Sequence, residues 1–484
     1  MSRPEPRKAT AHIREFLADS LTPLGVYRRL EEVSRTRFLF ESVTGGEQVS
    51  RFSFLGAGPR EIYRLYPERL EVEREGRREV VPGEPLEALR RVLGSVRAEP
   101  GPVPFTGGFV STFGYDLARM VEHLPHKPPD PHGLPVGLLA RFDTLAVFDH
   151  ARQRVLAVSN EVAGEVSRPE AEAQLDRMSA LLTRPGGNGG VPLPARLPRP
   201  AEGAASSLSG EAYQAAVERA RRYITDGDIF QVVLARRFQV PRAVEPLALY
   251  RALRMVNPSP YMVLLETPDA ALVGASPEML VRKTGRRLET RPIAGTRPRS
   301  SDGEEDRRLA AELLADPKER AEHVMLVDLG RNDIGRVAEA GTVSVESFME
   351  IERYSHVMHI VSSVEGDLEE DLSGLDALLA CFPAGTVSGA PKIRAMEIID
   401  ELEPEARGPY AGAVGYFSYT GDVDTCITIR TVVVQGGETS VTAGAGIVAD
   451  SDPRREQAET ENKAAGQLAA VALAEHLAAA EMGS

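Results

Sequence analysis

The chain has 484 residues, 42% hydrophobic and 26% charged, which is the composition of an ordinary soluble globular protein with sizeable cores. Its formal net charge of −14 argues against a nucleic-acid partner. Its two cysteines, Cys381 and Cys426, are too few for a disulfide framework or a cysteine-based zinc site.

The N-terminal segment MSRPEPRKATAHIREF is charged and has no apolar stretch of signal-peptide length. No run of the sequence is long and apolar enough to cross a bilayer. We therefore expect no export and no membrane partner, and the low cysteine content fits a reducing cytoplasm.

The first half of the chain is predicted to contain strands joined by turns and to close with a helix. Strand patterns occupy residues 38–46, 51–58 and 145–159, and an amphipathic helix covers 171–184. From Arg184 to Gly210, Gly, Pro and Ser replace any periodic apolar pattern, which predicts a flexible connection. The expected organisation is an N-terminal region (1–183), this connection (184–210) and a second region (211–484).

The second half alternates strands with helices. Ser209 is a plausible cap for an amphipathic helix that ends near Gly227. Strand runs follow at 229–240, 261–283 and 412–434, with helical sequence at 306–329 and an Ala-rich helix at 464–481. Hairpin-like turns at ETPDAA and SYTGDV predict an α+β fold of largely antiparallel sheets with helices outside.

Two pairs of glutamates stand far apart in the sequence but have the same spacing. Glu319 and Glu322 lie in KERAEHVMLVDL, and Glu456 and Glu459 in DPRREQAETENKA. Three residues apart on a helix, the members of each pair share one face. Four converging carboxylates need a cation between them, and all-oxygen ligands suit a hard ion such as Mg²⁺.

The alternative for each pair is a solvated helix face, which is the usual position of glutamates. The surroundings favour a site. EHVMLVDL is an amphipathic run that buries one side, and the small residues Gly444, Ala445 and Gly446 precede the second pair. Their backbone N–H groups could face an anion, although AGAG is also compatible with a tight crossing from strand to turn.

Several segments resemble the chorismate-utilising enzymes, most closely the branch of anthranilate synthase component I, and imply its two-lobed fold. They span almost everything from Asp226 to Lys463 and occur in the family's order. The segments are DGDIFQVVLARRF, GASPEMLVR, RPIAGTRPR, AEHVMLVDLGRND, RYSHVMHIVS, FPAGTVSGAPKIRAME, GPYAGAVGYF, DTCITIRT and AGAGIVADSDPRREQAETENKA. In the first half, FLFESV and RFSFLG carry a weaker resemblance.

The resemblance implies a pocket for a small dicarboxylate. Mg²⁺ would be held by Glu322 and Glu459, with Glu319 and Glu456 supporting it. The implied substrate-binding residues are Gly295, Thr296, Thr386, Tyr410, Arg430, Gly444, Ala445, Gly446 and Lys463. Arg430 would clamp a carboxylate with its forked donors. Its apolar neighbours also leave open a structural role on a strand.

Two residues match the family's groups for proton transfer. His359 in SHVMHI matches the catalytic histidine that assists late proton transfer and loss of pyruvate. Glu278 in SPE matches the carboxyl group that protonates the departing ring hydroxyl, because a shielded carboxyl can stay protonated near neutral pH. Without the resemblance, His359 could equally be a structural histidine.

Two positions discriminate between reactions of the family. Family members that activate water carry a lysine at the position of Gln231, and glutamine cannot act as a base. The aminodeoxychorismate synthases typically carry lysine at the position of Ala294, and alanine cannot form a covalent bond to the ring. The expected reaction is therefore Mg²⁺-dependent amination of chorismate by ammonia and elimination of pyruvate to give anthranilate, the first step of tryptophan biosynthesis.

Other readings stay open at this point. Aminodeoxychorismate synthase and a phenazine-type 2-amino-2-deoxyisochorismate synthase would release different products. A catalytically silent scaffold that senses tryptophan would bind a partner without turnover. Both cysteines lie inside synthase-like segments, so glutamine-derived ammonia is expected from a separate amidotransferase, component II, in a heterotetramer.

The resemblance also implies feedback inhibition by tryptophan. The implied site combines Ser42 of FES with Pro260, Tyr261 and Met262 of NPSPYM. Flat Pro and Tyr faces suit an indole ring, and a Ser hydroxyl suits the amino-acid end of the ligand. The alternative for NPSPYM is a rigid turn that leads into a strand.

Overall fold

A computed structural model describes residues 5–42, 51–184, 194, 198–200, 203–353 and 357–482. Its first half contains eleven strands: β1 (Arg7–Leu17), β2 (Arg37–Glu41), β3 (Phe52–Ala57), β4 (Glu61–Tyr66), β5 (Arg69–Arg74), β6 (Arg77–Val81), β7 (Val96–Ala98), β8 (Gly108–Phe113), β9 (Gly137–Phe142), β10 (Thr144–Asp149) and β11 (Arg154–Val162). The helices are α1 (Pro23–Leu30), α2 (Pro85–Leu93), α3 (Arg168–Thr183) and the 3₁₀ turns η1 (Tyr115–Met120) and η2 (His150–Arg152).

The second half supplies the remaining elements. The strands are β12 (Ala205–Ser206), β13 (Gln231–Val240), β14 (Tyr261–Glu266), β15 (Ala271–Ser276), β16 (Met279–Thr284), β17 (Arg287–Thr290), β18 (Ile293–Pro298), β19 (Ser344–Arg353), β20 (Val357–Asp367), β21 (Gly389–Ala390), β22 (Ala413–Ser418), β23 (Val423–Ile427), β24 (Thr431–Gln435) and β25 (Glu438–Ile447). The helices are α4 (Gly210–Thr225), α5 (Pro246–Val256), α6 (Gly303–Ala315), α7 (Pro317–Gly335), α8 (Gly374–Cys381), η3 (Gly385–Val387), α9 (Lys392–Leu402) and α10 (Pro453–Met482).

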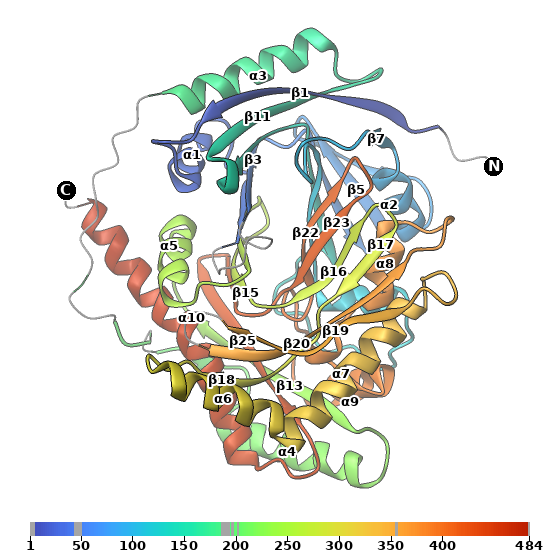
Figure 1. The fold of residues 1–484 in the computed structure, drawn as a ribbon, viewed down its shortest axis with the longest axis vertical. Coiled ribbons are helices and arrows are strands. Elements are labelled where there is room, and N and C mark those ends of the chain that lie inside the picture. The colour runs from blue at the N-terminus through green and yellow to red at the C-terminus, as the bar shows by residue number, and fades with distance from the viewer. Residues whose placement is uncertain are drawn as a thin grey trace.

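The strands form two large sheets with helices around the outside, which confirms the predicted α+β class (Figure 1). The first sheet has the order β12-β13-β25-β24-β15-β14-β2-β3-β10-β11-β1-β7, with β21 beside β13. The second has the order β18-β20-β17-β16-β23-β22-β8-β9-β4-β5-β6, with β19 beside β20. Within the described ranges only β1 and β7 pair in parallel.

Each sheet contains strands from both halves of the chain. In the first sheet β2 pairs with β14, and in the second β8 pairs with β22. Most of the connection expected at 184–210 lies outside the described residues. Its end is ordered, because β12 pairs with β13 and Ser209 accepts a hydrogen bond from Ala212 N as the predicted cap of α4.

Among the described residues, three large apolar clusters hold these layers together, and a small fourth one joins α6 to β19 and β20. One fills the space between the sheets, where Phe38 and Phe54 of the first sheet meet Phe142 and Tyr416 of the second. Another lies beneath α1, α3, α5 and α10, and the third lies beneath α2, α4, α8 and α9. Aromatic rings pack edge to face in the layer between the sheets, a geometry that adds to the effect of burial.

The helical sequence at 306–329 forms two helices instead of one. Asp316 caps α7 by accepting hydrogen bonds from the backbone N–H groups of Lys318 and Glu319, and Pro317 occupies the first turn. Proline there cannot continue α6 but suits the start of a helix. The break therefore places Glu319 and Glu322 in the first turns of α7. In the part of the chain that the model covers, no helix is long and apolar enough to span a membrane.

Candidate active site

The two glutamate pairs lie at the beginnings of α7 and α10, and their charges interact. Burial raises the pKa of Glu322, and the neighbouring carboxylates of Glu319 and Glu459 raise it further. Burial likewise raises the pKa of Glu456, to which the charge of Glu459 adds. Helices that are more than a hundred residues apart in sequence therefore bring like charges together.

Lysines partly balance this negative charge. Lys463 Nζ lies 2.6 Å from Glu459 Oε1, and its charge lowers the pKa of Glu322 and of Glu456. Lys318 Nζ lies 3.4 Å from Asp450 Oδ2 and acts on the same two glutamates.

The chemistry of the four carboxylates fits a divalent cation. In the described ranges no group of three His, Cys, Asp or Glu side chains is close enough to hold a metal ion as the side chains stand. Glu322 and Glu456 nevertheless have raised pKa values, and a divalent cation would relieve the repulsion that contributes to them. All the donors are oxygens at helix N-termini, which suits Mg²⁺ better than a softer metal.

Arg430, Lys463 and Gly444 form a continuous polar chain beside the carboxylates. Arg430 Nη1 donates to Lys463 O at 3.0 Å, and Lys463 Nζ donates to Gly444 O at 3.0 Å. Burial lowers the pKa of Arg430. The charges of Tyr410 and Glu459 act in the opposite direction and raise it. Arg430 has a φ of 51°, a strained left-handed conformation that turns the chain between β23 and β24.

The glycines of β25 leave room for neighbouring polar groups. A Cβ on Gly444 would lie 2.7 Å from Tyr410 Oη, and one on Gly446 would lie 2.7 Å from Gln231 Nε2. Ala445 between them points the other way and is fully buried. Glycine therefore allows the Tyr410 hydroxyl and the Gln231 amide to approach the backbone of this strand.

His359 is held by β18 in one tautomer. Its Nδ1 lies 2.8 Å from Gly295 O and 3.1 Å from Thr296 Oγ1. A carbonyl oxygen only accepts, so Nδ1 carries the proton and Nε2 is the basic nitrogen of the neutral ring. Burial lowers the pKa of His359, and the charge of Arg430 lowers it further, so the ring is neutral near pH 7.

Glu319 joins the histidine and carboxylate parts of the site. Arg297, also on β18, donates to Glu319 Oε1 at 3.2 Å. Gly295 has a φ of +68°, and a Cβ there would lie 3.0 Å from Glu319 Oε2. The strand that orients His359 therefore touches the first glutamate pair directly.

Glu278 lies between β15 and β16. Only 8% of the residue is exposed, and burial raises the pKa of its carboxyl group to about 8. Thr386 Oγ1 donates to Glu278 Oε1 at 2.9 Å. Backbone hydrogen bonds from Ile427 N to Glu278 O and from Ala275 N to Arg430 O place the backbone around Glu278 next to the Arg430 turn.

The residues predicted to bind tryptophan also come together, although they are more than 200 positions apart. β2 and β14 pair with Glu41 opposite Met262, so Ser42 follows the end of that ladder. The Ser42 hydroxyl is buried and has no hydrogen-bond partner among the described residues. Tyr261 donates to Asp424 Oδ1 at 3.0 Å, and Arg282 donates to the Tyr261 hydroxyl at 3.1 Å. Pro260, directly before Tyr261, is partly buried.

A buried ion pair that the sequence did not predict lies next to Tyr410. Arg407 and Glu403 pair at 2.5 Å with almost no exposure. Arg407 also donates to Val387 O at 2.6 Å and to Val233 O at 2.7 Å, and its guanidinium lies 5.6 Å from the ring centre of Tyr410. It thereby joins the Thr386 turn, β13 and Tyr410. The four-residue spacing of Glu403 and Arg407 on one segment is the only sequence signal for it.

Comparisons with known proteins identify a family over most of the chain. A family model described as chorismate binding enzyme matches residues 35–469. Component 1 of anthranilate synthase from Thermus thermophilus is 51% identical over 466 residues, covering 96% of this chain and 98% of that protein. The corresponding protein of Acetivibrio thermocellus is 47% identical, covering 94% of each chain.

Solved structures show the same fold. Anthranilate synthase component I from Streptococcus pneumoniae superposes with a TM-score of 0.79 at 39% identity, covering 87% of this chain and 92% of that one. The menaquinone-specific isochorismate synthase of Escherichia coli superposes with a TM-score of 0.72 at 19% identity, covering 97% of this chain and 96% of that one, and shows the fold alone.

Proposed function

This chain belongs to the chorismate binding enzyme family, and from that premise we propose that it is the synthase subunit of an anthranilate synthase. It aminates chorismate with ammonia, releases the ring hydroxyl as water and eliminates pyruvate to give anthranilate. The observation that carries this proposal is the meeting of two glutamate pairs beside a buried arginine and a buried, protonated carboxyl group.

Each end of the substrate has a group that suits it. Arg430 holds the enolpyruvyl carboxylate, aided by the Tyr410 hydroxyl and by the backbone of Gly444, Ala445 and Gly446. When Mg²⁺ is bound by Glu322 and Glu459, with Glu319 and Glu456 behind them, it supplies positive charge for the ring carboxylate. Lys463 adds a second positive charge at the same place.

Two groups of this chain move protons. Glu278 is protonated near neutral pH and donates to the departing ring hydroxyl, while Thr386 fixes the orientation of its carboxyl group. His359 serves the later step with the unprotonated Nε2 of its neutral ring. Gly295 and Thr296 hold that ring in place.

Two buried positions separate this reaction from its relatives. Gln231 and Ala294 are 6% and 7% exposed, and neither side chain can act as a base or a nucleophile. Ammonia is therefore the attacking group. This supports anthranilate over the products of water-activating or lysine-dependent relatives.

The ammonia comes from a separate glutamine amidotransferase, component II, in a heterotetramer. An amidotransferase nucleophile needs a reactive thiolate. Burial raises the pKa of the Cys381 thiol to about 12 and also raises that of Cys426, and both are fully enclosed. Neither cysteine can release ammonia from glutamine.

A product assay tests the function directly. The isolated chain with chorismate, Mg²⁺ and ammonium at high pH is expected to form anthranilate, detected by its fluorescence and by mass spectrometry. A silent scaffold would form no product, and the two rival synthases would form aminated ring compounds that retain the enolpyruvyl group. Either result would overturn the proposal.

Feedback control by tryptophan is proposed at the junction of β2 and β14. Ser42→Arg places a charged side chain where a small buried hydroxyl lies, and Met262→Thr changes a fully buried wall. We expect each variant to raise the tryptophan concentration for half inhibition by about 10-fold, or about 1.4 kcal/mol in binding. Met255→Thr, an exposed methionine at 43%, is the control and should leave inhibition unchanged.

Binding can be read separately from inhibition. The chain contains no tryptophan, so fluorescence excited in the indole band comes only from the added ligand, and a change in its emission reports binding. Melting temperatures of the variants show whether they fold. Full inhibition in folded Ser42→Arg and Met262→Thr variants would argue against this location.

A further inference from the structure

A small cavity lies beside Glu278. Its volume is about 30 Å³, and its polar lining residues are Glu278, Thr290, Thr386 and Asp333. Such a volume holds roughly two water molecules, given about 10–15 Å³ for each. Among the described residues the lining includes neither Arg430 nor His359, and the cavity adjoins the substrate site through Glu278 and Thr386.

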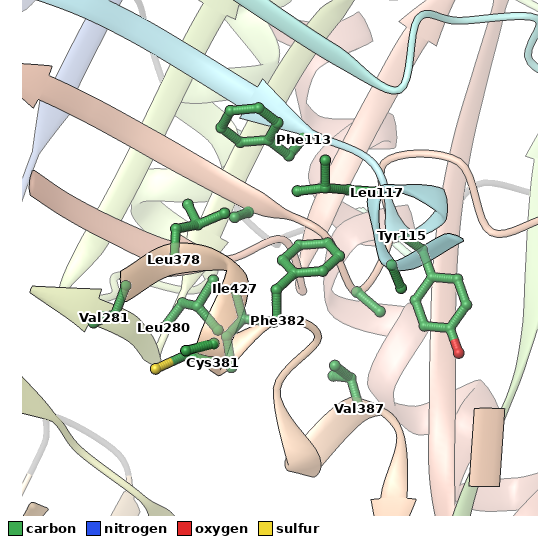
Figure 2. Close-up of a cluster of buried hydrophobic side chains, with 14 of the residues drawn as sticks. Phe113, Tyr115, Leu117, Leu280, Val281, Leu378, Cys381, Phe382, Val387 and Ile427 are labelled. Atoms are coloured by element: carbon green, nitrogen blue, oxygen red, sulfur yellow. The ribbon is translucent and has the colours of Figure 1, made fainter. Parts of the chain in front are cut away.

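The remaining wall is mainly apolar and belongs to the core. Leu280 and Cys381, neighbours in the buried cluster of Figure 2, line the cavity together with Leu326 and Leu329 of α7. Water inside therefore has only the few polar groups as partners. Ordered water in such a place links those groups to one another.

Asp333, one of the lining residues, belongs to an ion pair that is slightly exposed to solvent. Asp333 Oδ1 accepts a hydrogen bond from Lys392 Nζ at 2.7 Å, and the two side chains are 11% and 10% exposed. Burial raises the pKa of Asp333, while the charge of Lys392 lowers it. The pair therefore contains a titratable carboxyl group, that of Asp333, which is slightly exposed to solvent.

The proposed reaction creates a need for such a connection. Each turnover transfers the proton of Glu278 to the departing ring hydroxyl, which leaves as water, and Glu278 remains as a carboxylate. No electrons change hands, so the carboxylate must regain one proton before the next chorismate can react.

We propose that water in this cavity returns a proton from solvent to Glu278 after each turnover, with Asp333 and Lys392 as the positioning residues. The inference rests on the proposed function, because it assumes that Glu278 is the acid. The protons balance: the attacking ammonia releases one proton to solvent as it becomes the ring amine, and the water chain returns one proton from solvent through Asp333 to Glu278.

The test compares the first turnover with later ones in the full chain, with chorismate, Mg²⁺ and ammonium. In Asp333→Asn we expect the first equivalent of anthranilate to form at the wild-type rate and steady turnover to fall by about 10-fold or more. The slowed phase should show an increased solvent deuterium isotope effect, which a structural role would not produce. Lys392→Met should behave in the same way.

Two further variants keep the test decisive. Thr290→Val removes one polar group from the cavity wall without a change of charge, so it answers the question if Asp333→Asn does not fold. Arg394→Met is the control, because this arginine of α9 pairs with Asp228 at 3.3 Å and does not line the cavity. It should leave both phases unchanged.

The outcomes distinguish a failure of this inference from a failure of the proposed function. Equal slowing of the first and later turnovers would show a structural role and overturn the inference, as would wild-type rates and isotope effects in all three variants. If wild-type chain forms no anthranilate at all, the proposed function fails instead.

Discussion

Glu278→Gln is expected to lower kcat for anthranilate formation by about 10²–10⁴-fold, the usual contribution of a general acid. Glutamine has the same shape as the protonated carboxyl and can accept the hydrogen bond from Thr386, but it cannot donate a proton to a leaving hydroxide. Because binding groups remain in place, KM for chorismate should change little. Steady-state kinetics with chorismate and ammonia provide the measurement.

The pH dependence of the wild-type rate gives a second test of the Glu278 carboxyl group. Burial disfavours the charged carboxylate and raises the pKa of Glu278 to about 8, so the acid form that reacts is present below that pH. The rate at constant free ammonia should therefore fall as pH rises through about 8. A rate that stays level beyond pH 9 would contradict the assignment.

The stability of Glu278→Gln supplies the control for folding. The ordinary pKa of 4.5 is raised to about 8 in the folded chain, so the contribution of Glu278 to stability is complete below the ordinary pKa. It is lost as pH rises toward the folded value. Near pH 9 the glutamine variant should unfold at no lower temperature than wild type. A large destabilisation there would point to a structural role.

Glu322→Gln is expected to reduce kcat/KM for chorismate by about 10²–10³-fold, because it removes a charge that holds the divalent cation. The variant should also need far more Mg²⁺ for half-maximal activity. Calorimetric titration of Mg²⁺ into the chain measures that loss without turnover. Retained activity and retained Mg²⁺ binding would remove Glu322 from the proposed metal site.

The loss of activity in Glu322→Gln should not be accompanied by a loss of stability. Burial and neighbouring carboxylates raise the pKa of Glu322, so its charge is unfavourable in the metal-free chain. Replacing it with neutral glutamine should leave the metal-free chain at least as stable as wild type. Asp328→Asn, an exposed position at 58% on the same helix, is the matched control and should alter neither activity nor stability.

Local patterns predicted most of the elements that carry the site. The strand runs became β13, the β14-β15 hairpin and the β22-β23 hairpin, and the spaced glutamates lie on helices. One of the strands that local patterns miss is β1, whose sequence RKATAHIREFL is largely polar. It is a strand because β11 pairs with it along nine residues, which is tertiary context rather than propensity.

In the site, too, local sequence predicts some features, while others depend on contacts between distant segments. Helical spacing alone puts Glu319 beside Glu322, but only the folded sheets bring Glu459 near them. The raised pKa of Glu278 has no sequence signal, because it comes from burial by segments distant in the chain. His359 and Arg407 are likewise positioned by hydrogen bonds to backbone carbonyl oxygens. Every residue carries such an oxygen, so the sequence gives no signal for these contacts.

The interleaving of the two sheets affects how the chain is made on the ribosome. β2 completes its ladder only with residues 261–266, and β8 only with residues 413–418. Until those late segments emerge, both strands offer unpaired hydrogen-bonding edges, the kind of surface on which nascent chains associate wrongly. Productive folding is therefore largely post-translational, and fragments that stop before residue 413 are expected to collect in inclusion bodies.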